Sequence, residues 1–277
     1  MVTPNARRNR GQVILIGAIT LAFILLGIVV VFNGVLYTET LSSSAASQST
    51  ADAEVVEQGL ERNLVEIAHR GNLNGNWDSG DSFKEVITDP SGFADQYQNT
   101  TANSRSAIVD LQDVNTEEPA SVRSGGLDSE PTVDLNDNRV GYFTLTLSDP
   151  DNTGKVTINV TKEDNTSTEI TLEEESSTYD ITGASCDPSA HARVNLVTGE
   201  VNGSDCGGLD LITSSGYDQI EITADESGFD GSYDLVARDM DSGYDGIWKI
   251  EADITYESNQ VSYERTDATI EVYGDKR

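Results

Sequence analysis

Residues 248–254, Trp248-Lys249-Ile250-Glu251-Ala252-Asp253-Ile254, alternate apolar and polar side chains with a period of two. Successive side chains of a β-strand point to opposite faces, so this pattern predicts a strand with one buried and one solvated face. Shorter runs repeat the alternation, separated by turns rich in Asp, Asn and Gly, at 142–147, 156–160, 169–172, 220–222, 233–235, 261–263 and 270–272. Many short strands with such turns predict an antiparallel β-sandwich-like domain over residues 139–277.

The other end of the chain has a different character. Residues 11–38, GQVILIGAITLAFILLGIVVVFNGVLYT, carry no charge, and Arg7, Arg8 and Arg10 precede them. A run of about 20 apolar residues is long enough for a helix to cross the hydrocarbon core of a membrane, and flanking cations favour the cytoplasmic side. We therefore expect a basic leader at 1–11, a single transmembrane helix at 12–38 and an extracellular remainder.

Between these parts, residues 39–70 predict a stalk that becomes an amphipathic helix. Ala53, Val56, Leu60, Leu64 and Ile67 recur at intervals of three and four, which places them on one helix face. Residues 71–138 predict an irregular segment rich in Gly, Asn and Asp, with a short helix near 82–87 and a strand near 107–111. The expected fold is α+β and mainly β: a long N-terminal transmembrane and amphipathic helix, followed by the β domain.

The charge of the chain limits its partners. Lys and Arg number 17 against 48 Asp and Glu, which gives a formal net charge of −31. Phosphate repels such a surface, so nucleic acid is excluded as a natural partner. Abundant aspartate, few lysines and an even spread of acid resemble proteins of extreme halophiles such as haloarchaea, because molar salt screens carboxylate repulsion within about 3 Å. An ordinary acidic extracellular protein is the alternative.

Cys186 and Cys206 are the two cysteines of the chain. Outside a membrane they are free to form a disulfide, which by the chain-entropy argument would contribute about 3 kcal/mol, and two free thiols are the alternative. The segment that they enclose predicts a hairpin over 193–201, turning at Thr198-Gly199.

The junction Arg10-Gly11-Gln12 lies directly before the apolar run. It resembles the class III signal of archaeal type IV pilins and pilin-like proteins. The resemblance implies that a prepilin peptidase cuts between Gly11 and Gln12, and that the apolar helix then associates with itself or with other pilin-like subunits. Bacterial pilins carry a glutamate at mature position five, where this chain has Ile16. A plain signal anchor, or a signal peptide cut near Ser44-Ala45-Ala46, would explain the run differently.

Few residues indicate chemistry. There is no recognisable catalytic motif, so we expect neither an enzyme nor a cofactor. Asp239, Asp241 and Asp245 place carboxylates on alternate residues as a calcium loop would, although a solvated turn is the favoured interpretation. N-glycosylation sequons begin at Asn99, Asn159, Asn165 and Asn202, about as many as this composition gives by chance.

These features together predict a pilin-like surface protein, anchored by its N-terminal helix, with a β domain for adhesion or subunit contacts. The alternative is a single-pass, membrane-anchored extracellular binding domain that never assembles. A weaker third hypothesis is the exterior part of a larger sensory or substrate-binding complex.

Overall fold

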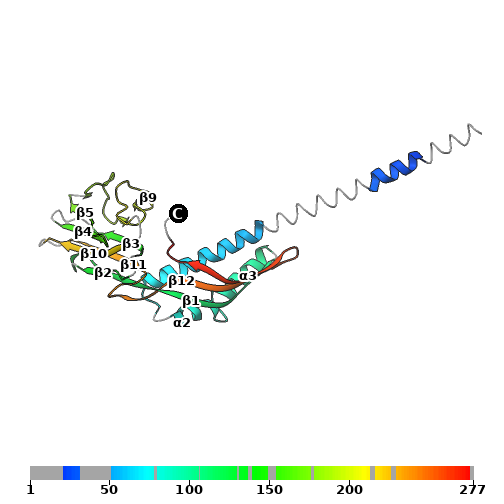
Figure 1. Ribbon diagram of the computed structural model, residues 1–277, viewed down its shortest axis with the longest axis horizontal. Coiled ribbons are helices and arrows are strands. Elements are labelled where there is room, and N and C mark those ends of the chain that lie inside the picture. The colour runs from blue at the N-terminus through cyan, green and yellow to red at the C-terminus, as the bar shows by residue number, and fades with distance from the viewer. Residues whose placement is uncertain are drawn as a thin grey trace, which may run out of the picture.

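The computed structural model describes residues 21–31, 51–77, 80–105, 107–129, 131–136, 139–148, 154–175, 178–212, 216–225 and 229–274. Within them the chain is mainly β, with two antiparallel sheets and a few helices (Figure 1). This confirms the expected α+β, mainly β class.

The larger sheet has eight strands in the order β13-β12-β1-β11-β3-β7-β8-β9. These are β1 (Ala107–Gly126), β3 (Val140–Leu147), β7 (Arg193–Asn195), β8 (Glu200–Val201), β9 (Ser204–Asp205), β11 (Gly231–Ala237), β12 (Tyr244–Ser258) and β13 (Ser262–Glu271). The smaller sheet has the order β2-β10-β4-β5-β6. Its strands are β2 (Thr132–Asp134), β4 (Lys155–Lys162), β5 (Ser167–Glu174), β6 (Tyr179–Ile181) and β10 (Tyr217–Ala224), and every pairing in both sheets is antiparallel.

Three helices form a layer on the larger sheet. They are the helix of residues 51–73, α2 (Gly80–Thr88) and α3 (Phe93–Arg105), and a short 3-10 turn, η1 (Leu127–Ser129), follows β1. Ala53, Val56, Leu60 and Leu64 of the first helix are buried with apolar residues of α2, β1, β12 and β13 in one core cluster. The expected amphipathic helix is therefore present, with its apolar stripe facing the sheet.

A second core cluster fills the space between the two sheets, so the predicted sandwich is also present. We call the cluster between the two sheets the sandwich core and the cluster between the helices and the larger sheet the helix core. Strand β11 shows how they are arranged, because Leu235 belongs to the sandwich core and its neighbour Val236 to the helix core. Adjacent side chains of a strand point to opposite faces. The helices thus cover one face of the larger sheet and the smaller sheet covers the other, and Figure 1 shows these two coverings at opposite ends of the body.

The short helix expected near 82–87 and the strand expected near 107–111 are present as α2 and the start of β1, but the expectation that the rest of 71–138 is irregular is wrong. This stretch contains α2, α3 and the 20-residue strand β1, so the sheets begin at Ala107 and not at residue 139. Strand β1 pairs with both β11 and β12, but its register shifts between Gln112 and Asn115 and again on both sides of Glu118. Bulges insert extra residues and so erase a strict period of two, and Pro119 lies at one of these irregularities.

Helix α3 has a mostly polar sequence, and Thr101 is its one buried residue. Its Thr100, Thr101, Asn103 and Ser104 side chains donate hydrogen bonds to carbonyls four residues earlier. Such local bonds satisfy the polar side chains within the helix itself. The helix therefore has no apolar periodicity by which its sequence could predict it.

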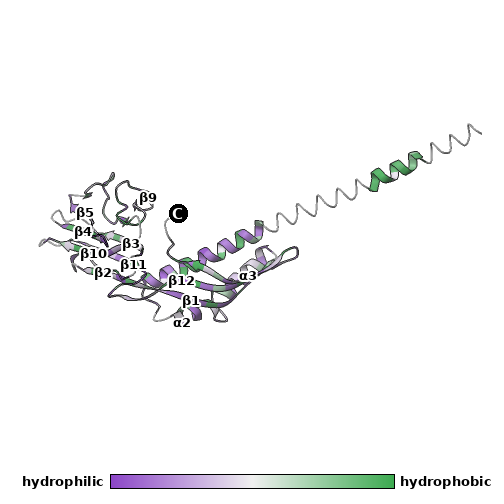
Figure 2. Cartoon of the chain, viewed as in Figure 1, coloured by the Kyte–Doolittle hydropathy of each residue, from purple (hydrophilic) through white to green (hydrophobic). Residues whose placement is uncertain are grey.

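Residues 21–31 are helical, and their large apolar side chains are 47–69% exposed. Figure 2 shows this short helix as uniformly apolar, whereas the 51–73 helix is mixed. Among the described residues no helix combines the length and apolar character needed to cross a membrane. Most of the expected transmembrane helix at 12–38 lies outside the described residues.

Candidate functional site

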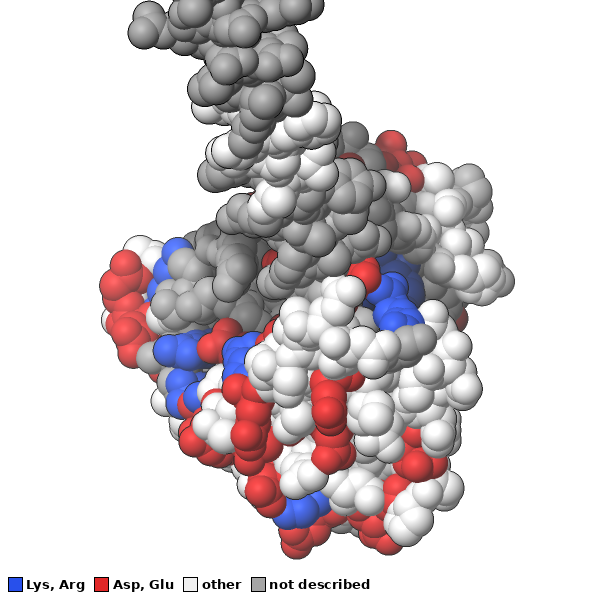
Figure 3. Space-filling model, turned by 90° about the vertical axis from the view of Figure 1, so that its right-hand side faces the viewer, with Lys and Arg blue, Asp and Glu red and all other residues white. Residues whose placement is uncertain are grey.

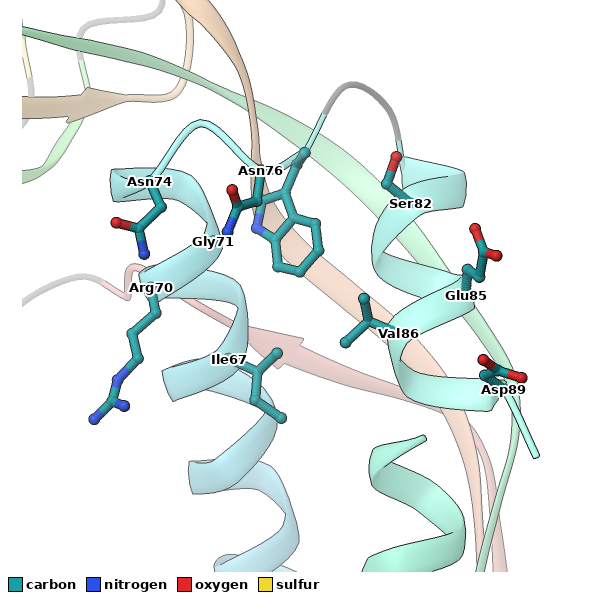
Figure 4. Close-up of a pocket in the computed structure, with 10 residues that line it drawn as sticks. Ile67, Arg70, Gly71, Asn74, Asn76, Ser82, Glu85, Val86 and Asp89 are labelled. Atoms are coloured by element: carbon teal, nitrogen blue, oxygen red, sulfur yellow. The ribbon is translucent and has the colours of Figure 1, made fainter. Parts of the chain in front are cut away.

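A cleft of about 680 Å³ opens between the end of the 51–73 helix and α2. The helix supplies Ile67 and Arg70 to one wall, and α2 supplies the other wall (Figure 4). In that view Ile67 and Val86 reach toward each other from the two helices. Trp77, Asn74 and Asn76, which follow the helical wall in the chain, also line the cleft.

Trp77 fixes the spacing of the two walls. Its indole is only 6% exposed, its Nε1 donates a hydrogen bond to the Ala68 carbonyl at 3.0 Å, and it meets the Phe83 ring edge-on at 5.3 Å. A Cβ on Gly71 would lie 1.9 Å from the indole Cε2, so only glycine lets the indole approach the helix this closely. The helix was expected to end at residue 70, but it continues to residue 73, and the turn uses Gly75, whose φ is +62°.

The polar side chains of the cleft are almost all unengaged. Within the described part of the chain, no hydrogen bond or ion pair forms on the side chains of five lining residues: Asn74, Asn76, Ser82, Glu85 and Asp89. Arg70 differs, because its Nε forms an ion pair with Glu66 at 2.5 Å. The cleft therefore has an apolar centre, free amide, hydroxyl and carboxylate groups around it, and one cation, Arg70, that is paired with Glu66.

The helical wall is attached to the sheet by a buried polar cluster around Asn72, which is fully buried. Its Nδ2 donates to the Ile247 carbonyl at 2.9 Å and to the Tyr273 hydroxyl at 3.1 Å, while its Oδ1 accepts from the Ile247 N–H at 2.8 Å. The Tyr273 hydroxyl also lies 2.9 Å from Nδ1 of His69. This cluster, Asn72, Ile247, Tyr273 and His69, is called the Asn72 clasp below.

Burial lowers the pKa of His69 from its ordinary value of 6.5. Nearby Glu66 and Asp234 oppose this effect, and Arg193 and Arg70 reinforce it. The Nδ1 of a neutral imidazole can accept a hydrogen bond from the Tyr273 hydroxyl, whose oxygen in turn accepts from Asn72, so the neutral form matches the observed contacts. Burial also raises the pKa of Tyr273, which keeps its hydroxyl protonated.

On its other side the 51–73 helix is tied to the edge strand β13. Arg265 forms ion pairs with Glu57 at 2.6 Å and with Glu61 at 3.0 Å, and the Tyr263 hydroxyl donates to Glu57 at 2.8 Å. Desolvation and the Glu57 carboxylate raise the pKa of Tyr263. The helix is therefore held at its end by the Asn72 clasp and along its side by these charged contacts.

The residues singled out from the sequence lie elsewhere. Cys186 and Cys206 form a disulfide with a Cα–Cα distance of 5.8 Å, and β7 and β8 form the hairpin expected inside that loop. Arg10, Gly11 and Gln12 lie outside the described residues, so the processing junction stays a prediction.

The aspartates proposed for calcium do not converge. Asp241 directly follows Met240, which forms an isolated β-bridge with Leu135. Asp245, in contrast, lies in β12 and pairs with Ser121 of β1. Across the described residues no group of three or more His, Cys, Asp or Glu side chains is arranged to hold a metal ion. Asp239, Asp241 and Asp245 therefore form no such group in the described part of the chain.

The four sequon asparagines lie in different settings. Asn165 and Asn202 are exposed in turns with φ of 62° and 51°, so a glycan would meet little obstruction there. Asn99 lies on α3, where its side chain donates to Asp95. Asn159 is half-buried in the middle of β4, between β5 and β10, which makes it a poor acceptor.

Comparison with known proteins gives one match. Residues 7–121 match a family described as "Family of unknown function (DUF7261)". The matched stretch includes the apolar segment, the three helices of the layer, part of β1 and every residue that lines the cleft. No curated protein and no solved structure matches the chain.

Sequence reasoning missed the cleft. Gly71 and Trp77 both fall in the stretch that was expected to be irregular, 71–138, and neither was proposed as a site residue. The available signal was the spacing of a glycine and a tryptophan around a short turn rich in asparagine, Gly71 to Trp77, between two helical stretches.

Proposed function

We propose that this chain is a type IV pilin-like surface protein of a halophile. The apolar N-terminal helix anchors the precursor in the cell membrane, with the N-terminus cytoplasmic and the β-rich body outside. After cleavage by a prepilin peptidase between Gly11 and Gln12, the helix associates with pilin-like subunits, either in a filament or at its end. The exterior body provides contacts for adhesion or for neighbouring subunits.

The observation that carries the proposal is the uncovered apolar helix. Residues 21–31 expose their large side chains, and the described part of the chain places nothing over them. Exposed apolar surface costs about 25 cal/mol per Å² in water, so a membrane or partner helices must cover this helix. The amphipathic 51–73 helix, packed on an antiparallel sheet, supports the same layout, because it joins such an anchor to an exterior body.

The surface charge is consistent with an exterior position in high salt. On the face shown in Figure 3, carboxylates outnumber lysines and arginines, in keeping with the net charge of −31. Molar salt screens the repulsion between such groups. The disulfide between Cys186 and Cys206 also favours an oxidising exterior.

The mature N-terminus tests the proposal. We expect mass spectrometry of protein from native membranes to give a chain that begins at Gln12, and Gly11→Phe to abolish cleavage and surface assembly. Gly27→Ala is the matched control, because a Cβ at Gly27 meets nothing within 4 Å, and it should be processed normally.

Two other results would replace the proposal. A chain that keeps its arginine leader would indicate the alternative, a static membrane-anchored binding domain. A chain beginning near Ser47 would indicate a secreted body without an anchor.

A further inference from the structure

We propose that the cleft between the 51–73 helix and α2 binds an uncharged carbohydrate. The anchoring function does not use this cleft, and the inference does not depend on it. Its volume, about 680 Å³, lies within the usual range of ligand sites, about 300–1,000 Å³. The class of ligand follows from the apolar, hydrogen-bonding and charged groups of the lining.

The apolar groups fit the C–H faces of a sugar ring. Val86 is 47% exposed, although most aliphatic side chains of the body are buried. Ile67 faces it from the other helix (Figure 4), and Trp77 also lines the cleft. A pyranose is a flat body whose faces carry C–H groups, so it can lie between two aliphatic walls while its hydroxyls point to the rim.

The polar groups fit the hydroxyls of such a ring. Each amide of Asn74 and Asn76 offers N–H donors and a carbonyl acceptor, Ser82 offers a hydroxyl, and the carboxylates of Glu85 and Asp89 accept. A sugar hydroxyl both donates and accepts, so it matches a rim that mixes donors and acceptors. These side chains have no partner in the described part of the chain, so a ligand would not have to displace an existing protein bond.

The charges disfavour other ligand classes. A phosphate, sulfate or uronate would face the carboxylates of Glu85 and Asp89, and the one cation of the lining, Arg70, already contacts Glu66 through its Nε. A basic peptide would find the two carboxylates, but it would leave the amide donors of Asn74 and Asn76 facing a cation. An uncharged polyol is the class that uses the whole lining.

The site is also held in shape before any ligand arrives. The Trp77 indole is hydrogen-bonded to the Ala68 carbonyl and packs on Gly71. The Asn72 clasp attaches the helical wall to the sheet. Preorganised walls reduce the ordering cost of binding. A weak ligand such as a neutral sugar therefore loses little of its binding free energy to rearrangement of the protein.

The test uses the full chain in lipid nanodiscs at high salt, because alkyl-glycoside detergents would compete for the cleft. The probes are neutral oligosaccharides of glucose, galactose, mannose and N-acetylglucosamine. Their binding is measured by saturation-transfer NMR and calorimetry. We expect saturable binding of at least one of them, about fivefold weaker in Asn76→Ala, which removes hydrogen bonds to the ligand. Val86→Asp should weaken it further.

Gln58→Ala is the matched control, because Gln58 lies on the same helix but lines a separate groove beside β13. It should bind like the parent chain. Absence of binding across the panel would overturn the inference, as would equal binding by the parent chain and Asn76→Ala. Tighter binding of an oligolysine peptide, lost in Glu85→Gln, would instead assign the cleft to a basic partner. None of these results depends on cleavage at Gly11.

Discussion

Replacement of Asn72 by alanine should be among the most damaging single substitutions in the helical layer. The Asn72 amide supplies the partner of both the Ile247 N–H and the Ile247 carbonyl, and it also donates to Tyr273. Asn72 is fully buried and Ile247 is 1% exposed, so water has little access to the groups that alanine would leave behind.

The magnitude follows from those orphaned groups. A buried donor or acceptor that loses its partner costs about 1–3 kcal/mol, because the desolvation of that group is no longer offset. Two such groups on Ile247, with some relaxation of the backbone, predict a loss of about 2–5 kcal/mol in the free energy of unfolding. Asn72→Asp keeps the acceptor for the N–H but sets a carboxylate against the carbonyl, so its defect should lessen as acid protonates the introduced carboxylate.

Denaturant titration at high salt, followed by tryptophan fluorescence, measures this loss. Trp77 and Trp248 are the two tryptophans of the chain, and both belong to the helix core, so their signal reports on the layer that the Asn72 clasp holds. Asn74→Ala is the control, since Asn74 is exposed and its side chain makes no bond in the described structure. If Asn72→Ala lost less than about 0.5 kcal/mol relative to this control, the reasoning from buried partners would be refuted.

Three further outcomes are expected. Gly71→Ala should destabilise the chain by about 1–3 kcal/mol, because its Cβ would overlap Trp77, and a denaturation midpoint equal to that of the parent would contradict the packing argument. The double change of Cys186 and Cys206 to serine should cost about 3 kcal/mol, and a reducing agent should reproduce the loss in the parent chain but not in the variant. Since burial depresses the pKa of His69 below 6.5, the folded state resists its protonation, so stability should be full above pH 6.5 and fall as the pH drops below it. Denaturation of His69→Gln at several pH values should show a weaker dependence in that range, and an unchanged one would rule His69 out as its source.

The sequence predicted the elements whose side chains alternate between core and solvent. The 51–73 helix and strands such as β12 each have one face on a core, so their apolar residues recur with the period of the element. Within the helix, Ala68 is buried as well, whereas Ile67 is only half-buried. Ile67 lies where the helix borders the cleft. Helix periodicity alone does not predict this partial exposure, because the exposure depends on where α2 begins.

The elements that the sequence missed, α3 and the part of β1 beyond residue 111, lack such a period for identifiable reasons. Strand β1 is interrupted by bulges around Glu118 and by Pro119, and α3 satisfies its polar side chains internally. The cleft was hidden for a different reason, because its lining comes from a helix end, a turn and a second helix. Each of these segments has an ordinary composition by itself, and only the approach of Trp77 to Gly71 brings the free polar groups together.

The position of the cleft relates the two proposals physically. Ile67 and Arg70 belong to the helix that follows the apolar segment, so whatever binds between this helix and α2 contacts the element nearest the anchor in the chain. That helix resists displacement through the Asn72 clasp at its end and through Arg265 at its side. A ligand that bridges the 51–73 helix and α2 adds a third attachment. Because the cleft exists only in the folded state, binding there raises the free energy of unfolding of the helical layer by mass action. Binding in the cleft should therefore raise the denaturation midpoint of the helix core, while Asn76→Ala, with the same fold and a weakened site, should show a smaller shift at the same oligosaccharide concentration.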